Sequence, residues 1–186
     1  DKVDLNDCQW VRVFGGNGSQ FLSSITVDDY GEIYNCCTTR NYNSENNLFS
    51  SMLLRKTGLN GELKAEFHLE TEGRLRNGKV KWIPYTGELM LLGEFENRMK
   101  WNDKEIFSEG GFDLFVASMN RNFLPIKLAG MGGPLNDRLS DFAIESPSTM
   151  LISGTFYEEM KIGSEILSSN GSSDSVLTKF NYDSFS

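Results

Sequence analysis

The sequence predicts an all-β protein built from short antiparallel strands. Its 186 residues include 18 glycines but only 4 prolines, and aromatic residues make up 12% of the chain. Asn-Gly pairs at residues 17–18, 60–61, 77–78 and 170–171 separate short apolar or alternating runs. Alternating runs bounded by such turns are typical of hairpins and meanders. No long stretch combines an apolar period of 3.6 residues with the caps that would indicate a helix.

Length and charge limit the class of protein further. The chain is close to the roughly 150 residues expected of one domain, and it is long enough to bury a core without metals or disulfides. Acidic residues outnumber basic ones 26 to 18, which gives a net charge of -8. Because nucleic acids and anionic membranes attract basic surfaces, we expect neither as a partner. No apolar run approaches the roughly 20 residues of a membrane helix, so membrane insertion is not expected.

An internal repeat of about 60 residues is predicted along the chain. A constant offset of 61 positions aligns residues 92–95 with 153–156, Met99 with Met160, and Asp113 with Asp174. The first third follows with a shifted offset, which aligns residues 31–33 with 87–89 and 51–56 with 113–118. These matches predict three copies, approximately at residues 9–63, 64–124 and 125–186.

A repeat of this length with about four short strands has the size of a propeller blade. Because one small sheet cannot bury both of its faces, such blades stack around an axis. The sequence therefore predicts a single β-propeller domain over residues 1–186, with four-stranded antiparallel blades and about three blades per chain. In the third copy we expect strands at residues 140–145, 150–156, 160–167 and 174–182.

A further segment links each copy to the next. It covers residues 63–69 after the first copy and 124–128 after the second, and residues 10–14 have the same pattern before a glycine pair. We expect residues 9–18 to act as the closing strand of the last blade, which lacks one strand. Pairing these residues with that blade would satisfy two exposed sheet edges. The alternative is a fragment with arbitrary ends.

Two stretches carry a more specific pattern. Residues 10–16 combine a tryptophan-containing run with a Gly-Gly turn, and residues 25–34 follow with a Val-Asp-x-x-Gly-x-apolar-Tyr pair of strands. Residues 152–156 and 162–174 repeat the later part, whereas residues 80–84 depart from it in the second copy. This pattern resembles the bacterial SBBP-type β-propeller repeat protein.

That resemblance implies a propeller in a secreted or cell-surface bacterial protein, and it implies no reaction. Rings of that family usually have more than three blades. We therefore expect a homodimer of two chains that completes a six-bladed ring, a common ring size. A piece of a longer chain is the alternative.

The sequence contains no recognisable catalytic or metal-binding set. His68 is the one histidine and stands in an alternating run, and no Gly-x-Ser-x-Gly elbow is present. Cys36 and Cys37 are neighbours in an expected strand. Cys8 could pair with one of them, although three unpaired cysteines fit the sequence better. We expect no enzyme activity, no metal and no cofactor.

The remaining reading is a non-catalytic extracellular module that binds a protein or a glycan through the rim or axis of the propeller. Aromatic side chains at blade rims can stack on sugars or anchor a partner. The candidate ligand-binding residues are Trp101, in an expected loop, together with Tyr157 and Tyr85. One alternative is a carbohydrate-active enzyme with carboxylates at the axis, drawn from Glu94, Glu96, Glu158 and Glu159. The other is a purely structural repeat domain of a larger surface protein.

Overall fold

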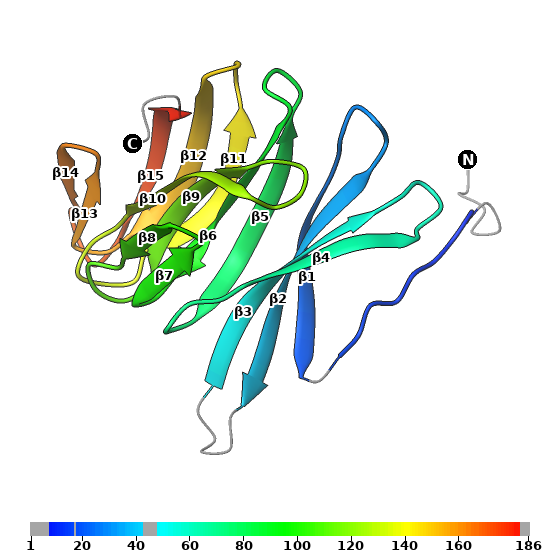
Figure 1. Ribbon diagram of the computed structural model, residues 1–186. Helices are drawn as coiled ribbons and strands as arrows, with labels where there is room; N and C mark the ends of the chain where they lie inside the picture. Colours follow the sequence, from blue (N-terminus) through cyan, green and yellow to red (C-terminus); the bar gives the residue numbers. More distant parts are fainter. Residues whose placement is uncertain (1–7, 17, 43–47, 183–186) are drawn as a thin grey trace, which may run out of the picture.

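The all-β prediction is confirmed. The computed structural model describes residues 8–16, 18–42 and 48–182, and strands account for most of them, with no α-helix in this part of the chain. The strands form three antiparallel sheets that lie one after another in chain order, and two short hairpins flank the second and third sheets (Figure 1). Within the described ranges, none of the sheets closes on itself.

Each sheet is a meander with its strands in sequence order. The first sheet contains β1 (Ser19–Val27), β2 (Ile33–Tyr42), β3 (Leu48–Thr57) and β4 (Leu63–Leu69). The second contains β5 (Leu75–Ile83), β6 (Glu88–Phe95), β9 (Asp113–Met119) and β10 (Pro125–Met131). The third contains β11 (Arg138–Ile144), β12 (Thr149–Phe156) and β15 (Asp174–Asn181). The hairpins are β7 (Arg98–Trp101) with β8 (Lys104–Phe107), and β13 (Glu159–Ile162) with β14 (Glu165–Ser168).

The sheets are shifted relative to the predicted repeat boundaries. The linking segments are β4 and β10, and they pair with β3 and β9 as the fourth strands of the preceding sheets. The three sheets therefore span residues 19–69, 75–131 and 138–181. Residues 160–167, expected as one strand of the third sheet, instead form most of the β13–β14 hairpin beside it. The third sheet thus has three strands among the described residues.

Apolar side chains fill the two spaces between neighbouring sheets. Strand β6 contributes to both, because alternate side chains of a strand point to opposite faces. Leu89 and Leu91 pack toward the first sheet, and Met90 and Leu92 pack toward the third. All four are at most 1% exposed. The second sheet is therefore buried on both faces.

Side-chain hydroxyls join the first strands of the first two sheets. The Ser24 hydroxyl donates to the Val80 carbonyl and accepts from the Val80 amide, both at 3.0 Å. The Thr26 hydroxyl accepts from the Trp82 amide at 3.0 Å. These bonds satisfy the backbone of β5 along β1, so β1 and β5 are held side by side without a regular ladder.

The two hairpins tie each sheet to the one before it. Thr71, just after β4, forms an antiparallel bridge with Met99 of β7, and Gly132, just after β10, forms one with Lys161 of β13. The Lys161 amide donates to the Gly132 carbonyl at 2.8 Å. Each hairpin therefore fastens the last strand of the preceding sheet.

The expected closing strand is not paired with the third sheet in this chain. Residues 8–16 form no strand, and Asn17 lies outside the described residues. The Trp10 indole donates to the Leu59 carbonyl at 2.8 Å, and the Arg12 guanidinium donates to the Gly61 carbonyl at 3.1 Å. The segment thus lies along the β3–β4 turn, at the far end of the array from the third sheet (Figure 1).

Candidate functional site

Trp101 does not lie in an exposed loop, which corrects the strongest aromatic prediction. It ends β7, where the alternation turns Met99 and Trp101 inward, and it is 2% exposed. Its ring stacks on Phe67 with 5.3 Å between centroids. The side chain joins the first two sheets and cannot meet a ligand at the surface.

The other two predicted aromatic residues lie apart from each other. Tyr85 is 64% exposed in the turn between β5 and β6, at the upper end of the sheets in Figure 1. Tyr157 is half-buried in the link between β12 and β13, at the lower end. The structure therefore does not bring Trp101, Tyr157 and Tyr85 together into one site.

The cysteines and the histidine do not form a catalytic pair. All three cysteines are free thiols; Cys8 is exposed, and Cys36 and Cys37 are buried in β2. Burial raises the pKa of Cys36 to about 12 and also raises that of Cys37, so neither thiol is activated. His68 is exposed on β4, and β3 separates it from Cys37.

The four candidate carboxylates do not converge. Glu94 is buried at the end of β6, whereas Glu96, just beyond it, forms an ion pair with Arg74 at 2.8 Å. Glu158 and Glu159 are exposed at the start of the β13–β14 hairpin. A pair of carboxylates facing one substrate, as glycoside hydrolysis requires, is therefore not formed by these residues.

A groove at the lower end of the sheets in Figure 1 brings together residues from all three sheets. We call it the arginine groove. It has a volume of about 500 Å³ and is lined by Phe21, Ser23, Thr38, Arg40, Arg76, Asn77, Glu94 and Arg138. These side chains come from β1, β2, β5, β6 and β11, so the site exists only when the three sheets are stacked.

Glu94 forms the buried base of the arginine groove. It is 2% exposed and forms an ion pair with Arg76. It also accepts hydrogen bonds from the Asn77 amide group at 3.0 Å and from the Leu139 backbone amide at 2.9 Å. The Arg76 guanidinium lies 3.6 Å from the centroid of the Phe112 ring. Because its oxygens already accept bonds from three residues, Glu94 holds the groove in shape.

Two arginines at the rim of the groove are available to a ligand. Arg40 and Arg138 are exposed, and neither forms an ion pair with a carboxylate among the described residues. The Arg40 guanidinium lies over the Phe21 ring at 4.9 Å. Ser23 and Thr38 also line the groove. Guanidinium groups bind carboxylates and other planar or tetrahedral anions in a bidentate manner, so the groove suits an anion.

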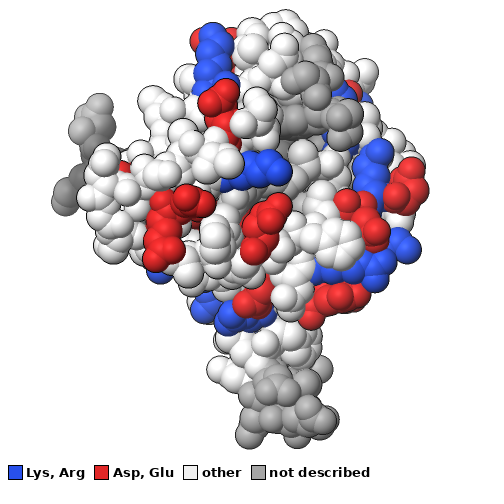
Figure 2. Space-filling model, turned by 90° about the vertical axis from the view of Figure 1, so that its left-hand side faces the viewer, with Lys and Arg blue, Asp and Glu red and all other residues white. Residues whose placement is uncertain are grey.

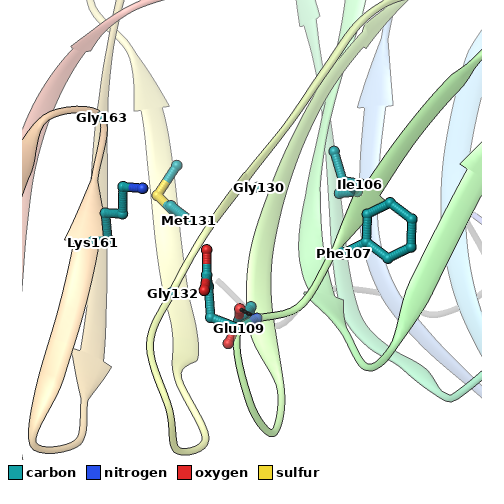
Figure 3. Close-up of a pocket in the computed structure, with 9 residues that line it drawn as sticks. Ile106, Phe107, Glu109, Gly130, Met131, Gly132, Lys161 and Gly163 are labelled. Atoms are coloured by element: carbon teal, nitrogen blue, oxygen red, sulfur yellow. Dashed lines mark hydrogen bonds between the residues drawn. The ribbon is translucent and has the colours of Figure 1, made fainter.

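A second cleft lies between the two hairpins (Figure 3). It has a volume of about 350 Å³, and its walls come from β8, the start of β9, β10 and β13. Lys161 reaches toward Met131, and Glu109 lies below them (Figure 3). The charged residues of the lining are Lys161, Glu109 and Asp113, and the other lining residues are apolar side chains or glycines. This cleft offers less specific chemistry than the arginine groove.

Two buried aspartates lie at this cleft: Asp113, at the start of β9, lines it, and Asp137 stands just before β11. Asp113 is 2% exposed and Asp137 is 0% exposed. Burial raises the pKa of Asp113 to about 7, and the negative charge of Asp137 adds to that shift. Burial raises the pKa of Asp137 to about 6. The Asp113 carboxylate accepts a hydrogen bond from the Glu109 amide at 2.7 Å, which orders the turn before β9.

Neither metal ligands nor a spanning helix are found in the part of the chain that the structure describes. No three or more histidine, cysteine, aspartate or glutamate side chains gather there as a metal site. No helix in these residues is long and apolar enough to cross a membrane.

Sequence reasoning missed the arginine groove. Arg40, Arg76 and Arg138 are spread over almost 100 positions, and no local motif joins them. Arg40 stands near the C-terminal end of β2, whereas Arg76 and Arg138 stand at the N-terminal ends of β5 and β11, so their positions are related only once the strand directions are known. Comparison of the chain with protein-family models gave no match, and comparison with curated proteins gave none either.

Proposed function

We propose that this protein is a non-catalytic binding module that holds a carboxylate-bearing glycan in the arginine groove. The observation that carries the proposal is the pair of exposed arginines, Arg40 and Arg138, which have no carboxylate partner among the described residues. The chain as a whole carries a net negative charge. These two arginines, which have no carboxylate partner among the described residues, give the groove a positive charge of opposite sign.

The other groups of the groove support a glycan in preference to a simple anion. The Thr38 hydroxyl can exchange hydrogen bonds with sugar hydroxyls. The Ser23 hydroxyl already donates to backbone carbonyls, and the Asn77 amide NH2 group already donates to Glu94 and the Leu139 carbonyl. These two side chains can therefore accept bonds from a sugar through their oxygens. The Phe21 ring is 50% exposed and offers a flat apolar surface beside them. Glu94 remains occupied by its internal bonds, which leaves the groove without a free acid or base for catalysis.

The propeller and the extracellular setting belong to the same proposal. Three meandering sheets in series, with β1 and β5 held side by side, are compatible with successive blades around an axis. The resemblance to the SBBP-type repeat points to the same arrangement and to a bacterial cell surface. In that arrangement the groove would lie at one end of the axis.

Calorimetric titration with a defined oligogalacturonate tests the proposal. We expect Arg40→Ala and Arg138→Ala each to weaken binding about tenfold or more, and added salt to weaken it in the parent chain. Arg98→Ala is the matched control, because Arg98 is an exposed arginine outside the groove that already pairs with Glu72 and Glu105. Equal affinity in the parent chain and both groove variants would refute the proposal. Binding of an acidic peptide but not of the oligogalacturonate would replace the glycan by a protein partner.

A further inference from the structure

We propose that the third sheet takes residues 9–16 of a second copy of this chain as its fourth strand, so that copies associate head to tail. The acceptor is the outer edge of β15 and the groove between β14 and β15. This β14–β15 groove has a volume of about 360 Å³, and its apolar lining includes Ile162, Leu167, Val176 and Leu177. The proposal does not depend on the ligand of the arginine groove.

The second sheet shows what fills the equivalent space. There, β10 pairs with β9 and also lies against β8. A Cβ atom on Gly130 of β10 would be in ordinary van der Waals contact with Phe95 of β6, at 3.5 Å, and with Ile106 of β8, at 3.7 Å. Strands β14 and β15 hold the positions of β8 and β9 in the third sheet, and the groove between them is the space that β10 occupies in the second sheet.

Residues 9–16 have the properties of the missing strand. Like residues 126–133, they form an apolar run that ends in two adjacent glycines. Val11 is 69% exposed and Val13 is 91% exposed, so these side chains are not used in the chain's own core. Extended apolar segments commonly bind by adding a strand to an open sheet edge.

Residues 9–16 also contact the first sheet of their own chain at the position expected of the fourth strand of a preceding sheet. The Lys127 ammonium of β10 donates to the Tyr182 carbonyl, just after β15, at 2.8 Å. The Trp10 indole donates to the Leu59 carbonyl, just after β3, at the same distance. Strands β3 and β15 occupy the same position in their sheets. Residues 9–16 therefore contact the first sheet in the same way that β10 contacts the third sheet. Strand β10 is the fourth strand of the second sheet, which precedes the third.

A second, independent observation relates the third sheet to the second: β15 begins with an aspartate that corresponds to Asp113 at the start of β9. The Asp174 carboxylate accepts from the Asn170 amide at 2.8 Å, as Asp113 accepts from the Glu109 amide at 2.7 Å. Asp113 is buried because Gly132 packs on it so closely that a Cβ atom there would lie 2.2 Å from its carboxyl carbon. Asp174 is half-exposed. In the proposed complex, the glycine pair at residues 15–16 of the second copy would cover it.

The geometry favours a second copy over the same chain. Residues 9–16 and β15 lie at opposite ends of the array (Figure 1). The end surface that carries the third sheet shows acidic and basic side chains interspersed with uncharged surface, so no single charge repels an approaching copy (Figure 2). A head-to-tail contact of this kind forms a ring when its rotation closes, and two copies would supply six sheets.

A designed disulfide tests the register. In the β9–β10 ladder Gly130 faces Phe115, which places Val13 of one copy opposite Val176 of the other. We expect the double variant Val13→Cys, Val176→Cys, made with Cys8→Ser, to form a covalent dimer on a non-reducing gel. Val13→Cys combined with Leu135→Cys is the control, because Leu135 is an exposed residue outside the groove. A cross-link confined to single chains would refute the second copy as the donor.

Light scattering on the unmodified chain provides a measurement that does not depend on these variants. We expect a mass near twice 21.0 kDa, falling to 21.0 kDa when an excess of a peptide of residues 9–16 is added. A scrambled peptide should leave the mass unchanged. A mass of 21.0 kDa at every concentration, together with no cross-link, would overturn the proposal. Arg40→Ala and Arg138→Ala should not change the mass, which separates this test from that of the groove.

Discussion

The second and third sheets share the order of their first three strands, yet they are buried to very different degrees. Every residue of β9 is buried, whereas residues along β15 alternate between half-buried and exposed. Val116 is 0% exposed and Leu177, at the equivalent position, is 74% exposed. The second sheet has a neighbour on each face, and the third has one on a single face among the described residues. Burial in this protein thus follows from the place of a sheet in the stack.

The substitution with the largest expected effect on stability removes a core side chain from the second sheet. Phe115 is 0% exposed and packs edge-on against Phe95. We expect Phe115→Ala to lower the free energy of unfolding by about 3–5 kcal/mol, because it leaves a cavity between two sheets. Urea denaturation measures the change. Leu177→Ala in β15 is the control and should change the stability of the monomer by less than about 0.5 kcal/mol. Similar losses for both variants would contradict the comparison.

The second test uses the two equivalent aspartates. Because the folded-state pKa of Asp113, about 7, lies above the ordinary value of 3.8, folding favours its protonated form. Its contribution to stability is complete below about pH 4 and is lost as pH rises toward 7. Asp137, with a pKa of about 6, acts in the same direction.

The stability of the parent chain should fall between pH 4 and pH 7, and we expect Asp113→Asn to make this fall smaller. The reduction should be at most about 1.4 kcal/mol for each pKa unit by which folding raises the pKa of Asp113. Chemical denaturation at a series of pH values measures this slope. Asp174→Asn, which alters a half-exposed carboxylate with an equivalent hydrogen bond, is the control; it is measured at dilution, where no second copy covers Asp174, and should change the slope less than Asp113→Asn. An unaltered slope in Asp113→Asn would show that this carboxyl group is not the source.

The third test concerns the hydroxyl bonds between the first strands. Ser24→Ala leaves the Val80 amide and carbonyl of β5 without their partner, so we expect a loss of about 1–3 kcal/mol. Ser153→Ala in the third sheet is the matched control. Its hydroxyl is more open and donates a single bond to the Asp141 carbonyl at 3.2 Å. Thermal unfolding should separate the two variants, and an equal effect would mean that the bonds between β1 and β5 contribute little.

The smallest expected effect is at an ion pair on the third sheet. Lys179 and Glu145 approach to 2.5 Å, with side chains 58% and 40% exposed. Exposed pairs of this kind contribute about 0–1 kcal/mol. We expect Lys179→Ala to change stability by less than about 0.5 kcal/mol at moderate salt, as measured by urea denaturation. A loss above 1 kcal/mol would show that the end sheet is more ordered around this pair than its exposure indicates.

Much of the secondary structure followed from local sequence. Asn-Gly turns and alternating runs predicted antiparallel strands, and residues 150–156 and 174–182 correspond closely to β12 and β15. Residues 160–167 were harder, because a hairpin of two four-residue strands has the same local alternation as one longer strand. The choice between them depends on which strand β12 pairs with, and that is a contact between distant residues.

The candidate site was less predictable than the strands. The alternation that turns Trp101 inward is visible in the sequence, but its burial results from the stacking of Phe67 on it from the first sheet. The arginine groove joins Arg40, Arg76 and Arg138 from three different sheets. No spacing within one strand encodes such a site, because the distances between its residues depend on how the sheets pack.

The sequence by itself determined the all-β class, the turns and the spacing of about 60 residues between matching segments. These depend on the conformational preferences of single residues and on the period of two along a strand, which are local properties. Only the tertiary structure decided which strand ends each sheet, which faces are buried and where the arginines meet. Those features arise from hydrogen bonds and packing between residues far apart in the chain, such as Ser24 with Val80 and Glu94 with the Leu139 amide.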